Sequence, residues 1–66
     1  MKTAYFRYFE ALGYWLPSND EAVAATSVIS KRFLRTNADL QACRSRGYTP
    51  MDYVTGKELG RVDVVA

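Results

Sequence analysis

The stretch SNDEAVAATSVISKRFL, residues 18–34, carries the clearest structural signal in this chain of 66 residues. Ser18 is typical of a helix N-cap, and Glu21 follows at the spacing of a capping box. Small and apolar side chains then recur at the spacing of one helical face, at Ala22, Ala25, Val28, Ile29 and Phe33. The pattern therefore predicts one amphipathic helix of about four turns over residues 19–34.

The segment before this helix is aromatic. Strand-forming aromatic residues are concentrated in residues 3–9 and recur in residues 14–16, with Gly13 between the two clusters. This arrangement favours a hairpin with strands over these two ranges. A helix over residues 3–12 is the alternative, because apolar side chains in that range also fall on one helical face.

The residues after the central helix predict a second, shorter helix. Thr36 or Asn37 can cap a helix over residues 38–46, and Gly47 would end it. Leu40 and Cys43 would then face inward, as buried apolar side chains. A strand over residues 39–45 is the alternative for this segment.

The C-terminal residues predict a second hairpin. Pro50 marks a boundary, and strands over residues 51–55 and 59–65 flank a loop that contains Gly56. The expected fold is a small single domain of the α+β class, covering residues 1–66. Its antiparallel sheet, made of the N-terminal aromatic hairpin and the C-terminal hairpin, packs on the one amphipathic helix.

The composition argues against catalysis. The chain has no histidine and a single cysteine, Cys43, so it lacks the commonest general base, the Ser-His-Asp and Cys-His arrangements and a cysteine-rich zinc site. Its acidic residues are scattered, and its glycines fit no phosphate-binding spacing. We therefore expect a protein that is not an enzyme and that binds neither a cofactor nor a metal ion. Cys43 is expected to be a small buried apolar residue, although its basic neighbours could lower the pKa of the thiol.

The net charge of +2 is unevenly distributed. Five basic residues and one acid lie between Lys31 and Arg46, which gives this segment a net charge of +4 and leaves −2 for the remainder. Part of this charge suits the negative end of a helix dipole, and the excess predicts a surface for phosphate or carboxylate groups. The expected binding residues in this segment are Arg32, Arg35, Arg44 and Arg46.

The second candidate surface is the N-terminal aromatic cluster, which consists of Tyr5, Phe6, Tyr8, Phe9, Tyr14 and Trp15. Its side chains are too many for one side of a short hairpin to bury, and the outward set is expected to be Tyr8, Tyr14 and Trp15. Nucleic-acid binding could use Tyr5, Tyr8 or Trp15 as stacking platforms on a sheet. It could also use a winged-helix arrangement, with the second helix as the reading helix and residues 56–60 as the wing.

In size and style the chain resembles the small accessory and inhibitor proteins that bacteriophages and mobile elements encode. The resemblance is one of type and rests on no motif. No targeting signal is visible, so we expect a cytoplasmic protein. The lack of catalytic residues and the surplus of arginine and aromatic residues predict a non-enzymatic protein that uses these residues to occlude a site on a host protein or nucleoprotein complex. A small DNA- or RNA-binding regulator is the alternative. A homodimer is compatible with either, and no membrane segment is expected.

Overall fold

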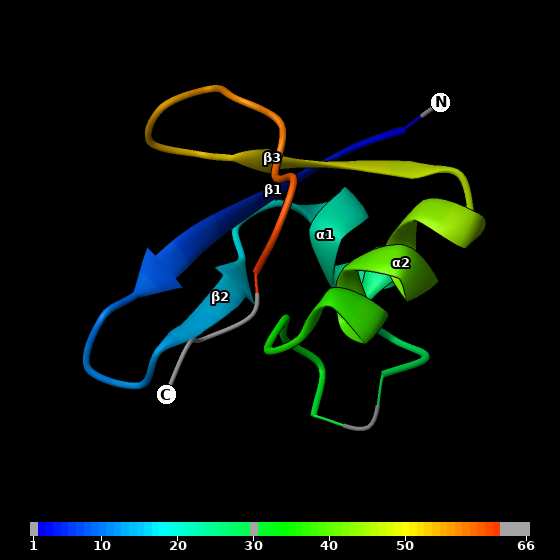
Figure 1. The fold of residues 1–66 in the computed structure, drawn as a ribbon. Coiled ribbons are helices and arrows are strands. Elements are labelled where there is room, and N and C mark those ends of the chain that lie inside the picture. The colour runs from blue at the N-terminus through cyan, green and yellow to red at the C-terminus, as the bar shows by residue number, and fades with distance from the viewer. Residues whose placement is uncertain (1, 30, 63–66) are drawn as a thin grey trace.

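The computed structural model describes residues 2–29 and 31–62, which form a three-stranded sheet and two short helices (Figure 1). In chain order the elements are β1 (Lys2–Phe9), β2 (Tyr14–Pro17), α1 (Asp20–Ala25), α2 (Asn37–Ser45) and β3 (Tyr48–Asp52). The prediction of a small α+β domain is confirmed.

The N-terminal hairpin is confirmed, and the alternative helix over residues 3–12 is wrong. β1 and β2 pair in antiparallel register, with Tyr8 opposite Trp15. The turn between them closes at Gly13, whose φ of 73° lies in the left-handed region that glycine adopts without steric cost.

The predicted all-antiparallel sheet is wrong, because β3 runs parallel to β1. The strand order is β2-β1-β3, and Lys2 of β1 lies opposite Tyr48. Pro50 is a buried residue within β3 rather than a boundary before it. A strand can hold this proline because it lies at the edge of the three-stranded sheet.

The predicted C-terminal hairpin is reduced to a single antiparallel bridge between Met51 and Glu58. Residues 53–55 form a turn, and residues 59–62 are not a strand. Residues 63–65 of the expected second strand lie outside the described residues. The pattern was misleading because Leu59 and Val62 reach the core from an irregular segment rather than from a strand.

The predicted helix over residues 19–34 is wrong beyond Ala25, where α1 ends. The hydroxyl of Thr26 donates to the carbonyls of Ala22 (3.0 Å) and Val23 (3.2 Å), and such bonds compete with the backbone pairing of a continuing helix. The β-branched residues that follow also have low helix propensity. The sheet therefore packs on two short helices instead of one long one.

The N-cap of α1 is Asn19 rather than the predicted Ser18. The Asn19 side-chain oxygen accepts from the backbone N–H of Ala22 at 2.9 Å and from that of Tyr5 at 3.0 Å. The hydrogen bond from Tyr5 explains why Asn19 rather than Ser18 is the N-cap, because the chain still runs beside β1 at this point. One side chain thus joins the start of α1 to the central strand.

The second helix is confirmed, and the alternative strand over residues 39–45 is wrong. Thr36 caps α2 and forms a complete capping box with Asp39. Leu40 and Cys43 are fully buried, as predicted.

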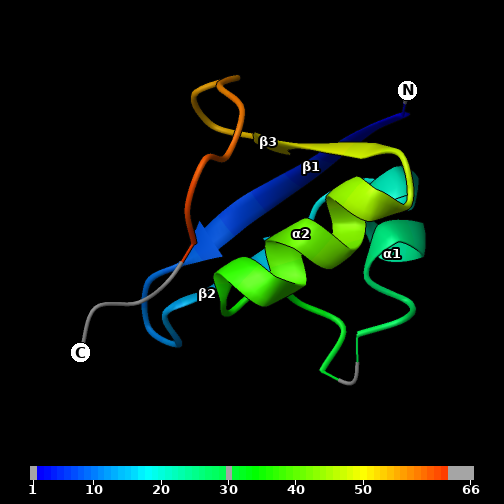
Figure 2. The ribbon, with the colours of Figure 1, turned by 45° about the vertical axis from the view of Figure 1, so that its right-hand side comes forward.

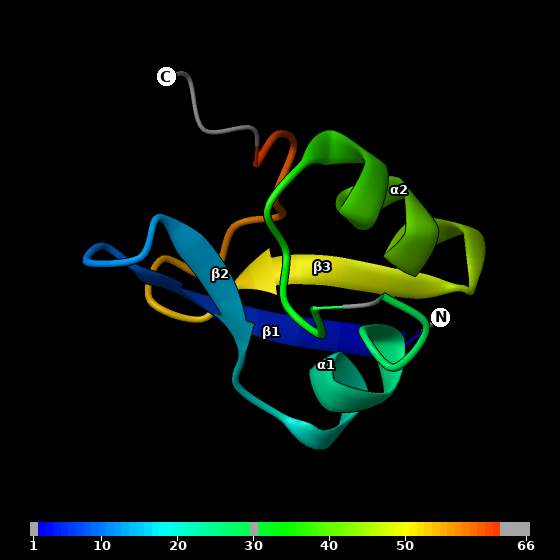
Figure 3. The same ribbon diagram turned by 90° about the horizontal axis from the view of Figure 1, so that it is seen from below.

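Both helices lie on the same side of the sheet, as turned views of the ribbon show (Figure 2; Figure 3). The buried side chains that join the two layers are Ala4, Phe6, Ala22, Ala25, Ile29, Leu34, Leu40, Cys43, Tyr48, Leu59 and Val62. Within β1 and β3 the buried positions alternate with partly or fully exposed ones. One face of the sheet therefore carries the core.

Short segments continue the sheet beyond both outer strands. Leu34 forms two backbone hydrogen bonds with Trp15, of 2.9 and 3.0 Å, beside β2. Glu58 is bridged to Met51 beside β3. These two segments cover part of each strand edge and restrict edge-to-edge association.

Candidate functional site

The face of the sheet opposite the helices is covered by neither helix (Figure 2; Figure 3). Side chains alternate between the two faces of a strand, so the positions between the buried ones point away from the helices. These positions, together with two aromatic residues that pack beside them, are Thr3, Tyr5, Arg7, Phe9, Tyr14, Leu16, Phe33, Thr49, Met51 and Tyr53. We call this surface the open face.

One aromatic cluster lies at the β2 side of the open face. The rings of Tyr14 and Phe33 stack with centroids 4.5 Å apart and planes 25° apart. The guanidinium of Arg35 lies 5.9 Å from the Tyr14 ring centroid, within the range of a cation–π contact. The 33–35 segment can reach Tyr14 because the Leu34 bridge aligns it with β2.

A second cluster lies at the β3 side of the open face. The rings of Tyr5 and Tyr53 meet edge to face, with centroids 6.0 Å apart. The guanidinium of Arg7 lies 6.0 Å from the centroid of the Tyr53 ring. Tyr53 is 57% exposed, so this cluster remains accessible to solvent.

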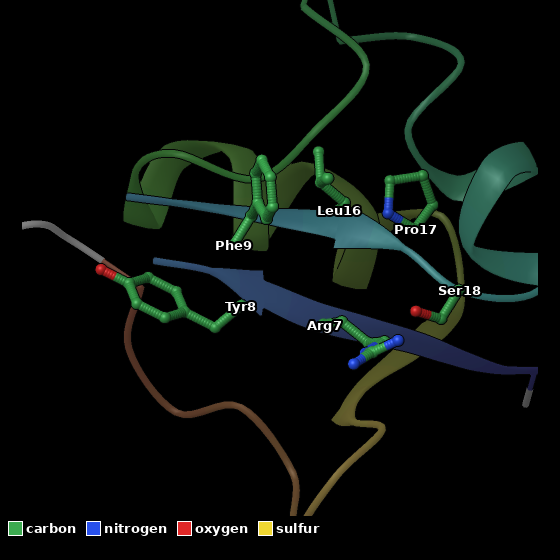
Figure 4. A pocket seen from close by; sticks show the side chains of 6 residues that line it. All are labelled: Arg7, Tyr8, Phe9, Leu16, Pro17 and Ser18. Atoms are coloured by element: carbon green, nitrogen blue, oxygen red, sulfur yellow. The ribbon is translucent and has the colours of Figure 1, made fainter. Parts of the chain in front are cut away.

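An open hollow of about 350 Å³ lies along β1 and β2 (Figure 4). It is lined by Arg7, Tyr8, Phe9, Leu16, Pro17 and Ser18. Phe9 and Leu16 rise from the same side of the hollow in the close view, whereas Tyr8 points away from the other labelled side chains. The lining offers the Arg7 cation, the Ser18 hydroxyl and an apolar wall, and it contains no carboxylate.

The four arginines predicted as a binding surface do not share one set of contacts. Arg44 forms an ion pair of 3.1 Å with Glu58 and also donates to the carbonyl of Leu59. It thereby ties the 58–59 segment to α2. This is the only ion pair among residues 2–29 and 31–62.

Arg46 is also occupied within the fold. Its guanidinium donates to the carbonyls of Ala24 (2.8 Å) and Ala25 (3.2 Å) at the C-terminal end of α1. It lies 5.6 Å from the ring centroid of Tyr48. Arg46 therefore supplies the cation that the last turn of α1 lacks, and it joins the end of α2 to the end of α1.

The remaining predicted residues divide between the two faces. Arg35 and Tyr14 lie together in the β2-side cluster, and Arg32 is exposed, with a φ of 62° that is rare outside glycine. Trp15 packs against the core on the helix side. The ring of the half-exposed Tyr8 lies beside it, with ring centroids 5.2 Å apart. Of the three aromatic residues expected to point outward, the structure places one on the open face.

Comparison with protein families, curated proteins and solved structures finds no match to this chain. No helix among the described residues is long and apolar enough to cross a membrane. In the same part of the chain, no group of three or more His, Cys, Asp or Glu side chains is placed to hold a metal ion.

The single thiol is buried. Cys43 Sγ lies 3.6 Å from the carbonyl oxygen of Ala25, to which it donates. Burial raises the pKa of the thiol from 9.0 to about 11; the Asp39 carboxylate adds to this shift, and Arg46 opposes it. The interpretation of Cys43 as a buried apolar residue is confirmed, and the raised pKa argues against a reactive thiolate.

Sequence reasoning missed several residues of the open face, of which Arg7 and Phe9 line the hollow. The sequence does contain a signal for Arg7 and Phe9, which is the alternation of side chains along a strand. In a strand over residues 3–9, the alternate positions 3, 5, 7 and 9 share one face. No local signal places Phe33 or Tyr53, because the folded chain brings them to the open face from a loop and a turn.

Proposed function

We propose that this chain is a non-enzymatic binding protein and that the open face is its contact surface. The observation that carries the proposal is the exposure of aromatic rings on a sheet face that neither helix covers. Phe9 is 47% exposed and Tyr53 57% exposed. Exposed apolar patches on soluble domains often mark interaction sites, and Tyr and Arg are prominent among the residues that dominate interface energetics.

The proposed contact surface does not include Arg44 and Arg46, which lie at the C-terminal end of α2. Arg44 and Arg46 have polar partners within the fold, whereas the guanidinium groups of Arg7 and Arg35 lie over rings of the open face. A phage-type accessory or inhibitor protein that occludes a site on a host macromolecule would present such a surface. We place the occluding contact on the open face.

Affinity capture with a matched pair of variants tests the proposal. Phe9→Ser combined with Tyr14→Ser removes two open-face rings, and Val23→Ser changes an exposed apolar residue on α1, on the other side of the sheet. Retained protein and nucleic acid are both quantified, from lysate with and without nuclease. Circular dichroism checks that each variant keeps the fold.

We expect the Val23→Ser variant to retain what the wild type retains and the open-face variant to lose it. Equal retention by both variants would contradict the proposal, because it would place the contact elsewhere. The nuclease treatment reports the class of the partner independently of where the partner binds.

A further inference from the structure

We infer that the partner of the open face is a single strand of nucleic acid. This inference rests on the proposed function and names the occupant of that surface. It is carried by three features of the open face: the hollow beside Arg7, the ring clusters on both sides of it, and the absence of acidic side chains from the outward strand positions.

The hollow has the chemistry of a nucleotide site. Its volume of about 350 Å³ is in the range that holds a small ligand. Phe9 and Leu16 offer an apolar wall for a base, and the Arg7 guanidinium lies in the same lining for a phosphate. The hydroxyl of Ser18 adds a neutral hydrogen-bonding group.

The ring clusters extend this site across the sheet. Tyr14 stacks on Phe33 at one side, and Tyr53 packs against Tyr5 at the other. Unpaired bases stack on exposed rings, such as those of Phe9 and Tyr53 on this face, whereas the bases of a duplex are already stacked on one another. The open face therefore favours a single strand over a double helix.

The charge of the open face is complementary to phosphate. Each ring cluster carries one guanidinium, that of Arg35 or that of Arg7, and neither forms an ion pair among the described residues. The outward positions of all three strands contain no Asp or Glu. A polyanion can approach without repulsion from the strands, and the two cations would neutralise phosphates.

Fluorescence anisotropy with the purified chain tests this inference directly. The probes are labelled single strands of about 12 nucleotides, poly-dT and poly-U, and a mixed-sequence duplex of the same length. Salt is varied between about 20 and 200 mM, because phosphate contacts weaken with salt. Variants are Phe9→Ala and Arg7→Ala, with Val23→Ala and Arg61→Ala as matched controls, and sedimentation records any self-association.

We expect at least one single-strand probe to bind more tightly than the duplex. Phe9→Ala should weaken that binding roughly tenfold, the effect of one lost stacking contact. Arg7→Ala should reduce the slope of the salt dependence by about one. Neither control variant should change affinity by more than about twofold, because Val23 lies on α1 and Arg61 lies outside the open face.

Three results would overturn the inference. These are no binding of either single strand at the lowest salt, tighter binding of the duplex, and equal losses in the open-face and control variants. If these assays fail while affinity capture still depends on Phe9 and Tyr14, the open face binds a protein or a second copy of this chain. The proposed function then stands without this inference.

Discussion

Replacing Arg46 by methionine should destabilise the fold, although Arg46 is an exposed residue. The change removes a cation that donates to two carbonyls at the end of α1, at 2.8 and 3.2 Å, and that contacts the ring of Tyr48. Methionine keeps much of the apolar length of the side chain, so the loss reports mainly on the guanidinium.

The expected loss in the free energy of unfolding is about 2 kcal/mol. A hydrogen bond from a charged donor contributes roughly 1.5–3 kcal/mol, and exposure puts this one at the lower end. The cation–π contact adds about 0.5 kcal/mol, and the interaction with the helix dipole is largely the same charge effect as the hydrogen bonds. A domain of this size has only about 3–5 kcal/mol of stability, so the loss would be a large fraction of it.

Urea unfolding followed by circular dichroism measures this loss as a lower transition midpoint at unchanged slope. Arg61→Met is the control, because Arg61 is an exposed cation outside the α1–α2 contact. Arg46→Lys should fall between the wild type and Arg46→Met, since it keeps the charge but not the forked donor. If Arg46→Met and Arg61→Met differ by less than about 0.5 kcal/mol, Arg46 has no such structural role.

Three further predictions concern the core, a cap and a turn. Burial raises the pKa of Cys43 to about 11, above the 9.0 of an exposed thiol, so the folded state favours the protonated form. The stability that the protonated thiol contributes is complete below about pH 9 and is lost as the pH rises through 11. Between about pH 8.5 and 10.5, the free energy of unfolding measured in urea should therefore fall by roughly 1–2 kcal/mol more for the wild type than for Cys43→Ala. Asn19→Ala should cost about 1–2 kcal/mol in thermal unfolding, because it removes the acceptor of two backbone N–H groups; a cost below about 0.3 kcal/mol would contradict this role. Gly47→Ala should cost about 1 kcal/mol because φ is +89°, whereas Gly60→Ala, with no such φ and open space around it, should be near neutral; equal costs would argue against backbone strain.

The elements predicted correctly are those specified by neighbouring residues. The hairpin follows from strand-forming aromatics on both sides of Gly13, and α2 follows from the Thr36 capping box and the glycine after its end. The extent of α1 depends on distant residues. Arg46 takes two carbonyls at its end, and the Leu34 bridge holds the following segment extended beside β2.

The residues of the candidate site also differ in whether the local sequence could predict their role. Tyr14 and Arg35 were predicted from composition and charge, and the structure brings them together through the Leu34 bridge. Local charge could not reveal that Arg44 and Arg46 are used inside the fold, because their partners lie 14 or more positions away along the chain.

The parallel pairing of β1 with β3 has a consequence for how the chain folds. β1 can pair with β2 through a short local turn, but Lys2 meets Tyr48 only after both helices and the intervening loop have been brought into place. Closing that long loop costs entropy before the contacts on either side compensate for it. The hairpin should therefore form early, and docking of β3 should limit the folding rate. The same order is expected during synthesis, because β3 leaves the ribosome after β1, β2 and both helices.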